Sequence, residues 1–170
     1  KYGTNPKWIN VAGITVANGH LGKFYTDSAG IARPYTYNCA GWFVERGEHI
    51  TFRNCKATGN GNGFFVASGG DLATLSDAIK FDRCESWGNG NIGRDSEHQW
   101  FTEALSIEYL RCRWRDGVGN CAGAKDRSRR RLFWECWGST NKRILDLVDP
   151  EGSAKVVVPM APDSTIVEGC

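Results

Sequence analysis

The side chains best suited to acid–base chemistry lie close together in residues 92–104. Asp95, Glu97 and Glu103 place three carboxylates within this short stretch. A glycoside hydrolase needs two carboxyl groups roughly 5 to 9.5 Å apart, one acting as an acid and the other as a nucleophile or base. The three residues are therefore candidate catalytic residues. The simpler alternative is a solvated, charged loop that does no chemistry.

The densest charge lies in residues 125–131, where five of the seven residues are basic. A polysaccharide lyase needs a base that removes the proton beside a uronic carboxylate, and a cation that neutralises this carboxylate. Lys125 and Arg127 are the candidates for the base. The cluster also fits an acidic polysaccharide, through charge-assisted hydrogen bonds, or an acidic surface on a sister subunit. Together the two segments give four candidate substrate-binding residues: His98, Trp100, Arg129 and Arg130.

The charge, the hydropathy and the absence of certain motifs argue against several other classes of protein. The net charge is only +2, which argues against a nucleic-acid-binding protein. No run approaches the roughly 18 apolar residues of a membrane-spanning helix, so no membrane insertion is expected. The sequence has no CxxC pair, phosphate-binding loop or zinc motif. We therefore expect no metal and no cofactor, apart from Ca²⁺ if the protein is a lyase.

The cysteines reveal an internal repeat that must position these segments. Each copy has large residues at positions one and three and a cysteine at position six. The copies are Ile50-Thr-Phe52-Arg-Asn-Cys55, Ile79-Lys-Phe81-Asp-Arg-Cys84, Ile107-Glu-Tyr109-Leu-Arg-Cys112, Arg131-Leu-Phe133-Trp-Glu-Cys136 and Thr165-Ile-Val167-Glu-Gly-Cys170. Consecutive cysteines are separated by 29, 28, 24 and 34 residues. A period of this length is typical of stacked repeats rather than of one globular core.

Each copy predicts a strand, a sharp corner and a second strand. Alternation at positions one and three points one strand face inward, and a corner at positions four to five turns the cysteine inward as well. We therefore expect a column of buried, reduced thiols, which fits folding in a reducing cytoplasm. Small residues such as Ala57 and Ser86 follow on the inner face. Cys39 and Cys121 lie off this column and receive no role.

A turn and a third strand complete each copy. Asn and Gly in residues 59–61 and 88–90 predict turns, because these residue types tolerate positive φ. Gly63-Phe-Phe-Val66 predicts the third strand and matches Gly41-Trp-Phe-Val44 one copy earlier. We expect Gly22-Lys-Phe-Tyr25 to be the copy before that.

Three longer excursions are expected to leave the strands as loops, at residues 68–77, 92–104 and 117–131. The second and third of them hold all of the candidate site residues named above. The chain also has seven tryptophans, too many for the interior of a narrow repeat structure. Some of them should therefore stand on the outer surface, where aromatic side chains stack on sugar rings or meet another subunit.

The run Ile-x-Phe-x-Asn-Cys-x-Ala-x-Gly-Asn-Gly-x-Gly-Phe at residues 50–64 resembles the repeat of the pectate-lyase-like β-helix superfamily. The resemblance extends over residues 35–140, and residues 38–65 are most similar to bacteriophage tailspike-type proteins. It implies an all-β fold, a right-handed parallel β-helix of about five to seven rungs. Residues 1–170 would form a single segment of a longer chain or assembly. One departure is the corner, where many members stack asparagines; here the residues are Asn54, Arg83, Arg111, Glu135 and Gly169.

The resemblance also implies a function. It points to a carbohydrate-directed protein of tailspike type that recognises a bacterial surface polysaccharide, with depolymerisation of that glycan as a further option. It implies a homo-oligomer, with a trimer as one arrangement, in a virion or extracellular location. Two alternatives stay open: a free polysaccharide lyase or epimerase, and a structural β-helix spacer or assembly protein without a sugar site.

Overall fold

The computed structural model describes residues 5–35, 39–67, 76–90, 98–102, 104–117, 120–124, 130–140, 145–148 and 155–156. The regular structure in these residues is all β-strand, and most strand pairs are parallel. No helix among the described residues is long and apolar enough to cross a membrane. The all-β class expected from the sequence is therefore confirmed.

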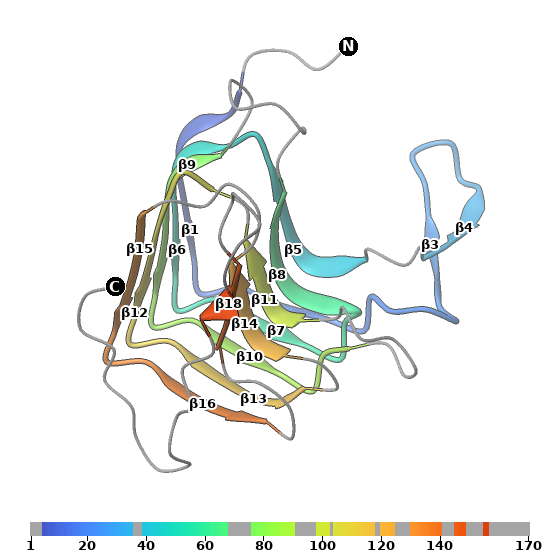
Figure 1. Ribbon diagram of the computed structural model, residues 1–170. Helices are drawn as coiled ribbons and strands as arrows, with labels where there is room; N and C mark the ends of the chain where they lie inside the picture. Colours follow the sequence, from blue (N-terminus) through green and yellow to red (C-terminus); the bar gives the residue numbers. More distant parts are fainter. Residues whose placement is uncertain are drawn as a thin grey trace.

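Three sheets contain nearly all of the strands (Figure 1). Sheet I comprises, in spatial order, β1 (Lys7–Ala12), β6 (Glu48–Arg53), β9 (Asp77–Asp82), β12 (Ser106–Leu110) and β15 (Arg130–Trp134). Sheet II comprises β2 (Thr15–Ala17), β7 (Lys56–Thr58), β10 (Glu85–Trp87), β13 (Arg113–Gly117) and β16 (Trp137–Thr140). Sheet III comprises β5 (Ala40–Glu45), β8 (Asn62–Ala67), β11 (His98–Thr102), β14 (Asn120–Ala124) and β17 (Leu145–Val148), with β18 (Lys155–Val156) antiparallel at its end.

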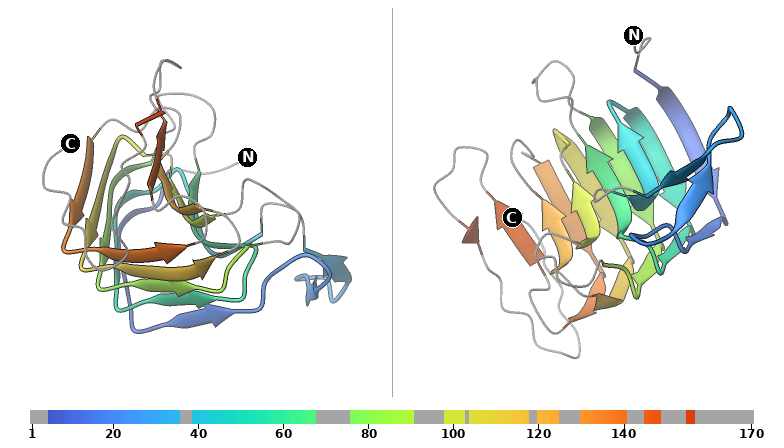
Figure 2. Two further views of the ribbon diagram at one scale, coloured as in Figure 1. Left: turned by 60° about the horizontal axis from the view of Figure 1, so that its bottom comes forward. Right: turned by 90° about the vertical axis from the view of Figure 1, so that its right-hand side faces the viewer.

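From β6 onward the chain visits sheets I, II and III in the same order each time, and each visit adds a parallel strand beside the previous one (Figure 2). One such passage is called a circuit here. Ile50 pairs with Ile79, Ile79 with Ile107, and Ile107 with Arg131. The circuits are therefore 29, 28 and 24 residues long, the same as the spacings between the corresponding cysteines.

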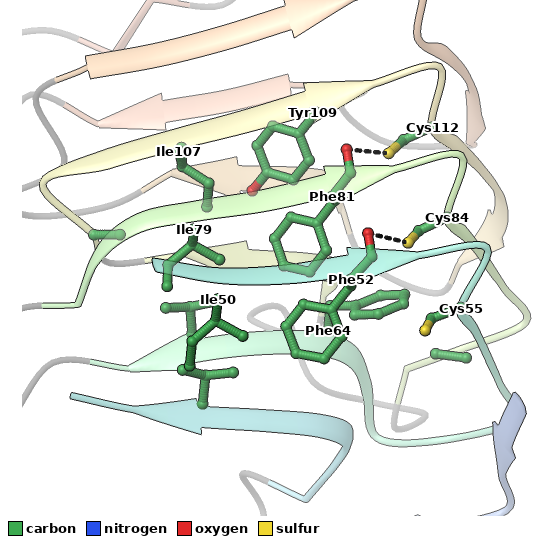
Figure 3. Close-up of a cluster of buried hydrophobic side chains, with 14 of the residues drawn as sticks. Ile50, Phe52, Cys55, Phe64, Ile79, Phe81, Cys84, Ile107, Tyr109 and Cys112 are labelled. Atoms are coloured by element: carbon green, nitrogen blue, oxygen red, sulfur yellow. Dashed lines mark hydrogen bonds between the residues drawn. The ribbon is translucent and has the colours of Figure 1, made fainter. Parts of the chain in front are cut away.

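The space between the three sheets is filled by columns of like side chains (Figure 3). Ile50, Ile79 and Ile107 form one column. Beside it, four aromatic rings stack with centroids 5.2, 5.4 and 4.7 Å apart, in the order Phe52, Phe81, Tyr109 and Phe133. The core cluster also takes residues from sheets II and III, such as Ala57 and Phe64, so one interior serves all three sheets. Full burial of such side chains stabilises the fold by about 1.5–3 kcal/mol each.

The cysteines form the predicted column next to the aromatic one. Cys55, Cys84, Cys112 and Cys136 are buried, and none of these four is in a disulfide. Each thiol donates to a backbone carbonyl of the preceding circuit: Cys84 Sγ lies 3.4 Å from Phe52 O, and Cys112 Sγ 3.4 Å from Phe81 O (Figure 3). Burial raises the pKa of the Cys84 thiol to about 12. The four thiols are thus buried packing groups, as expected, and Cys39 is also buried, away from the column.

The predicted sharp corner lies at position five of the four described repeats, one residue before the cysteine; the fifth copy, at residues 165–170, lies outside the described residues. The four corner residues have φ of 51–53° and are Asn54, Arg83, Arg111 and Glu135. Their backbones stack: Arg83 N–H donates to Leu110 O at 2.8 Å, and Arg111 N–H to Trp134 O at 2.7 Å. A single left-handed residue therefore turns the chain from sheet I into sheet II in every described circuit.

An asparagine ladder occurs at a different corner from the one considered in the sequence. Asn60 and Asn89 are almost fully buried between sheets II and III. The Asn60 backbone N–H donates to Asn89 Oδ1 at 2.9 Å, and Asn60 Oδ1 accepts the N–H of Gly19 at 3.0 Å. The turns predicted at 59–61 and 88–90 are confirmed, with Gly59 and Gly88 in the positive-φ positions. The asparagines beside them satisfy buried backbone groups of neighbouring circuits, which a turn alone does not require.

The expected third-strand copy at residues 22–25 is wrong. Phe24–Thr26 forms β3, which pairs antiparallel with β4 (Ala32–Pro34) in a hairpin that projects beside sheet III (Figure 1). Asp27 folds the turn, because its carboxylate accepts the backbone N–H groups of Ala29 and Ile31, each at 2.9 Å. The copies at 41–44 and 63–66 are confirmed, since β5 and β8 pair with Trp42 opposite Phe64.

The expected loops are also shorter than the sequence suggested. The excursion at 92–104 contains β11, and the excursion at 117–131 contains β14 and the start of β15. Residues 76 and 77 of the first excursion belong to a bridge and to β9.

Candidate functional site

Most of the site residues predicted from the sequence lie outside the described residues. These are Asp95, Glu97, Glu103, Lys125, Arg127 and Arg129. Three others have a described backbone position. His98 pairs with Asn120, and Trp100 pairs with Phe64, whose side chain is fully buried. Arg130 is the first residue of β15 and pairs with Ser106. His98 and Trp100 thus belong to a strand rather than to a loop, and the binding and catalytic roles stay predictions.

Among the described residues, charged and aromatic side chains lie together on the outer face of sheet II instead. After each cysteine of the column, the strand alternates between outward and inward residues. Glu85 and Trp87 flank the buried Ser86, and Arg113 and Arg115 flank the buried Trp114. Neighbouring strands pair in register, Glu85 with Arg113 and Trp87 with Arg115. The inward residues hold the strands on the core, so the outward side chains stand in two parallel rows.

A hollow of about 490 Å³ lies on this face. Its lining residues come from three adjacent strands and the last corner: Glu85, Ser86, Trp87, Arg113, Arg115, Glu135 and Trp137. This volume lies within the range of ordinary ligand sites. The lining combines two indole rings with two guanidinium and two carboxylate groups. Strands in such a sheet are about 4.8 Å apart, so the hollow extends roughly 10 Å across β10, β13 and β16.

Trp87 is held between cationic side chains of the two neighbouring strands. Arg115 lies 5.6 Å from the centre of its ring, and Lys56 Nζ lies 6.0 Å from it. Lys56 Nζ also lies 3.7 Å from Glu85 Oε2, on the next strand. Cation–π contacts of this kind contribute about 0.5–1 kcal/mol at exposed sites. They restrain the orientation of the indole ring, and Trp87 is also one of the residues that line the hollow.

Arg113 and Glu135 are the charged lining residues without an ion pair in the described part of the chain. Both side chains are exposed. Arg113 has Glu85 and Trp137 as its neighbours in register. A guanidinium presents five N–H donors in a fixed plane, and a carboxylate only accepts hydrogen bonds. The hollow therefore offers both donors and acceptors to a ligand rich in hydroxyl groups.

A second charged cluster lies at the corner between sheets I and II. The Asp82 carboxylate accepts hydrogen bonds from Arg53 Nε at 3.2 Å, Arg83 Nη2 at 3.1 Å and Arg111 Nη2 at 3.3 Å. Burial pushes the pKa of Asp82 up, but the hydrogen bonds and charge of Arg83, with the bonds from Arg111 and Arg53, bring its pKa below the usual value. We call these four residues the arginine corner.

No group of three or more His, Cys, Asp or Glu side chains in the described part of the chain could hold a metal ion. Two carboxylates, Glu85 and Glu135, line the same hollow.

The sequence also contains a pattern that indicates this outer face, although it is not part of the repeat of inward residues. In three circuits, the residues one and three places after the cysteine point outward: Lys56 and Thr58, Glu85 and Trp87, Arg113 and Arg115. These positions do not repeat in type, unlike the isoleucine, aromatic and cysteine positions of the core. A search for large or charged residues at these two places would have found Trp87 and both arginines.

Comparison with known proteins gives this chain no assigned family: no protein-family model matches it, and no curated protein or solved structure is significantly similar to it.

Proposed function

We propose that the circuits are successive coils of a right-handed parallel β-helix of the pectate-lyase-like kind, with the three sheets as its sides. The support is the fixed order of the sheets, the in-register parallel pairing and one shared core. Parallel crossover connections are right-handed in nearly all proteins, which favours the right-handed form. The resemblance of residues 50–64 to the superfamily repeat agrees with this arrangement, as does the resemblance of residues 38–65 to tailspike-type proteins.

We further propose that this β-helix is carbohydrate-directed and binds a polysaccharide along the outer face of sheet II. The observation that carries the proposal is the hollow lined by Trp87, Trp137, Arg113, Arg115, Glu85 and Glu135. Indole rings stack on the apolar faces of sugar rings, while charged groups exchange hydrogen bonds with hydroxyls. A face built of parallel strands repeats every 4.8 Å or so, which suits a long, repetitive ligand.

The test is retention on a panel of bacterial polysaccharides, measured for the full chain and for Trp87→Ala and Trp137→Ala. Removing an aromatic anchor from a binding face weakens binding by about 1–3 kcal/mol, roughly tenfold or more. Phe43→Ala is the matched control: Phe43 is an exposed aromatic residue on the outside of sheet III, stacked on Phe65 at 5.3 Å.

Loss of retention in both tryptophan variants, with Phe43→Ala unchanged, supports the proposal. If the unmodified chain and the three variants are retained equally, the glycan binds outside the face of sheet II. The segments that carry Asp95, Glu97, Lys125 and Arg127 are then the next candidates. If the unmodified chain is retained by no polysaccharide in a broad panel, the result favours a structural spacer without a sugar site.

Depolymerisation is the second candidate activity, favoured by the two carboxylates in one hollow. In a glycoside hydrolase, one of Glu85 and Glu135 acts as the acid and the other as nucleophile or base. Glu85→Gln and Glu135→Gln should then abolish chain shortening, measured by chromatography, while glycan retention persists. Unsaturated products that absorb in the ultraviolet would instead indicate a lyase, with or without Ca²⁺, and activity that survives both substitutions would exclude these two residues.

The tailspike-like pattern also carries a proposal on assembly and location: a homo-oligomer, including a trimer, exposed on a virion or cell surface. Light scattering of the purified chain tests it. A stable monomer at micromolar concentration would count against assembly by this segment and would leave the glycan-binding proposal untouched.

A further inference from the structure

The arginine corner holds more positive charge than its own structure requires. Arg53, Arg83 and Arg111 surround the single carboxylate of Asp82. One guanidinium is enough to neutralise a buried carboxylate, and additional like charges repel one another. The Asp82 side chain is 7% exposed, whereas the three arginine side chains are each about half exposed, at 54, 52 and 51%. The excess charge therefore faces outward.

The acidic groups around the corner do not cancel this excess. Glu85 and Glu108 are each paired with a lysine on the neighbouring strand, at 3.7 and 3.2 Å. Glu135 occupies the next corner position along the stack, yet the guanidinium of Arg111 is directed to Asp82. With Arg113 two residues further on, four arginines face two carboxylates in this part of the surface. A net positive charge remains after every described partner is counted.

The hydrogen-bond donors at the corner are also mostly unused. Arg53 donates to Asp82 through Nε alone, and Arg111 through one terminal nitrogen. Arg83 donates through Nε and one terminal nitrogen. Each guanidinium has five N–H donors in one plane, a geometry that matches the oxygens of carboxylate, sulfate or phosphate. Asp82 fixes the three side chains in advance, so little conformational entropy is lost when a second anion binds.

The corner is continuous with the proposed glycan face. Glu135 belongs to the stacked corner residues and also lines the hollow. Arg111 is followed two residues later by Arg113, which lines the hollow too. A chain of sugars across β10, β13 and β16 therefore passes next to the guanidinium groups of Arg83 and Arg111.

We propose that the arginine corner is a binding site for an anionic substituent, a carboxylate or sulfate, of the glycan that lies on sheet II. This inference rests on the proposed function and narrows its ligand to an acidic polysaccharide. Arg83 and Arg111 contact the anion, and Asp82 positions them.

The first experiment tests the anion site without any glycan. The arginine Nε–H resonances of the ¹⁵N-labelled full chain are followed during titration with sodium sulfate, with sodium chloride at equal ionic strength as the reference. We expect saturable shifts at Arg83 and Arg111 that the double variant Arg83→Gln, Arg111→Gln does not show. Arg33 in the β3–β4 hairpin, paired with Asp27 at 3.0 Å, is the internal control and should not shift. Shifts that are linear in salt, or equal at Arg33, overturn the anion site.

The second experiment asks whether the anion belongs to a glycan. A uronic-acid oligosaccharide and its methyl ester are compared by calorimetry, since the added methyl group removes the negative charge of each sugar and leaves its hydroxyl groups unchanged. We expect the free acid to bind at least about tenfold more tightly, with the advantage lost in the double variant. Circular dichroism confirms the folding of the variant, in which Arg53 still pairs with Asp82.

The outcomes separate the two proposals. Equal binding of acid and ester, dependent on Trp87, overturns the acidic-glycan inference and leaves the proposed function standing. If neither form binds but sulfate shifts the arginine resonances of the corner saturably, the site binds a free anion. This result contradicts the acidic-glycan assignment. No binding of either form and no sulfate response overturns the inference completely, while the wider polysaccharide panel decides the proposed function separately.

Discussion

The interior face of sheet I and the outer face of sheet II follow opposite rules, although both sheets are built from parallel strands paired in register. Inside, the columns on sheet I repeat one kind of side chain, such as Ile50, Ile79 and Ile107. Outside, each strand of sheet II brings a different kind to the same place: Lys56, Glu85, Arg113 and then Trp137. The spacing of neighbouring strands is the same in both sheets.

The repeating interior side chains stabilise the fold, whereas the varied outer side chains are exposed to ligands. Like side chains stack well at the spacing of neighbouring strands, because identical shapes fit in parallel without voids. A column of mixed charges and rings gains little packing energy, since most of its surface stays in water. Variation at outward positions is thus compatible with the fold and available for recognition.

The largest expected effect comes from breaking an interior column. Phe81 is fully buried and stacks between Phe52 and Tyr109. Phe81→Ala should lower the free energy of unfolding by about 3–5 kcal/mol, through lost contacts and a cavity. Phe43→Ala, at a position 53% exposed, should change it by about 1 kcal/mol or less. Urea denaturation measures both, and similar losses in the two variants would contradict the distinction between interior and outer face.

The next largest effect concerns the inner row of sheet II, where a large side chain packs directly beside a glycine. Trp114 follows the small Ala57 and Ser86 in the inner row of sheet II, and it pairs with Gly138. A Cβ atom on Gly138 would lie 2.0 Å from Trp114 Nε1. Gly138→Ala should therefore lower the free energy of unfolding by about 1–3 kcal/mol.

A double-mutant cycle with Trp114→Phe provides the control. The smaller ring should relieve the clash, so the two losses should not add. Full additivity of the two losses in urea denaturation would show that Gly138 is required for another reason.

A smaller effect concerns the thiol column and has a defined pH range. The pKa of Cys84 is raised by burial to about 12 in the folded chain, against an ordinary value of 9.0. Between these two values the unfolded chain loses the proton and the folded chain keeps it. The free energy of unfolding should therefore fall as pH rises above about 9, by roughly 1 kcal/mol per pH unit for this thiol.

Denaturation of Cys84→Ala between pH 8 and 10.5 or so serves as the comparison. Its pH slope should be shallower than that of the unmodified chain by about one proton. Identical slopes would mean that the Cys84 thiol titrates normally and is open to water.

The smallest effect is expected from an ion pair on the outer surface of sheet I. Lys80 Nζ lies 3.2 Å from Glu108 Oε2, and both side chains are more than a third exposed. Lys80→Gln should change the free energy of unfolding by less than about 0.5 kcal/mol, because water screens the pair. A loss near 2 kcal/mol would show that outer-surface pairs also hold the sheets together.

The interior could be predicted from the sequence because packing forces it to repeat. Cys55, Cys84 and Cys112 mark the corner in every circuit, and the isoleucine and aromatic columns follow from their fixed distance to these cysteines. Asn60 and Asn89 were predicted only as turn residues, since the sequence pattern does not distinguish an exposed turn asparagine from a buried one that bonds the next circuit.

The outer face could be predicted only in part. That some tryptophans stand outside is confirmed by Trp87 and Trp134, but the rows of sheet II were not identified, because residues that face water need not repeat. The β3–β4 hairpin was mistaken for a strand of sheet III, since Phe24 and Tyr25 match the local pattern and only the turn at Asp27 separates the two outcomes.

The most direct measurement of the central claim is an amide chemical-shift map of the ¹⁵N-labelled chain titrated with a polysaccharide fragment selected by the binding panel. The account predicts shifts concentrated in β10, β13 and β16, at Glu85–Trp87, Arg113–Gly117 and Trp137, with the interior columns and the β3–β4 hairpin unchanged. Shifts concentrated on sheet III or on the hairpin, with sheet II silent, would contradict it.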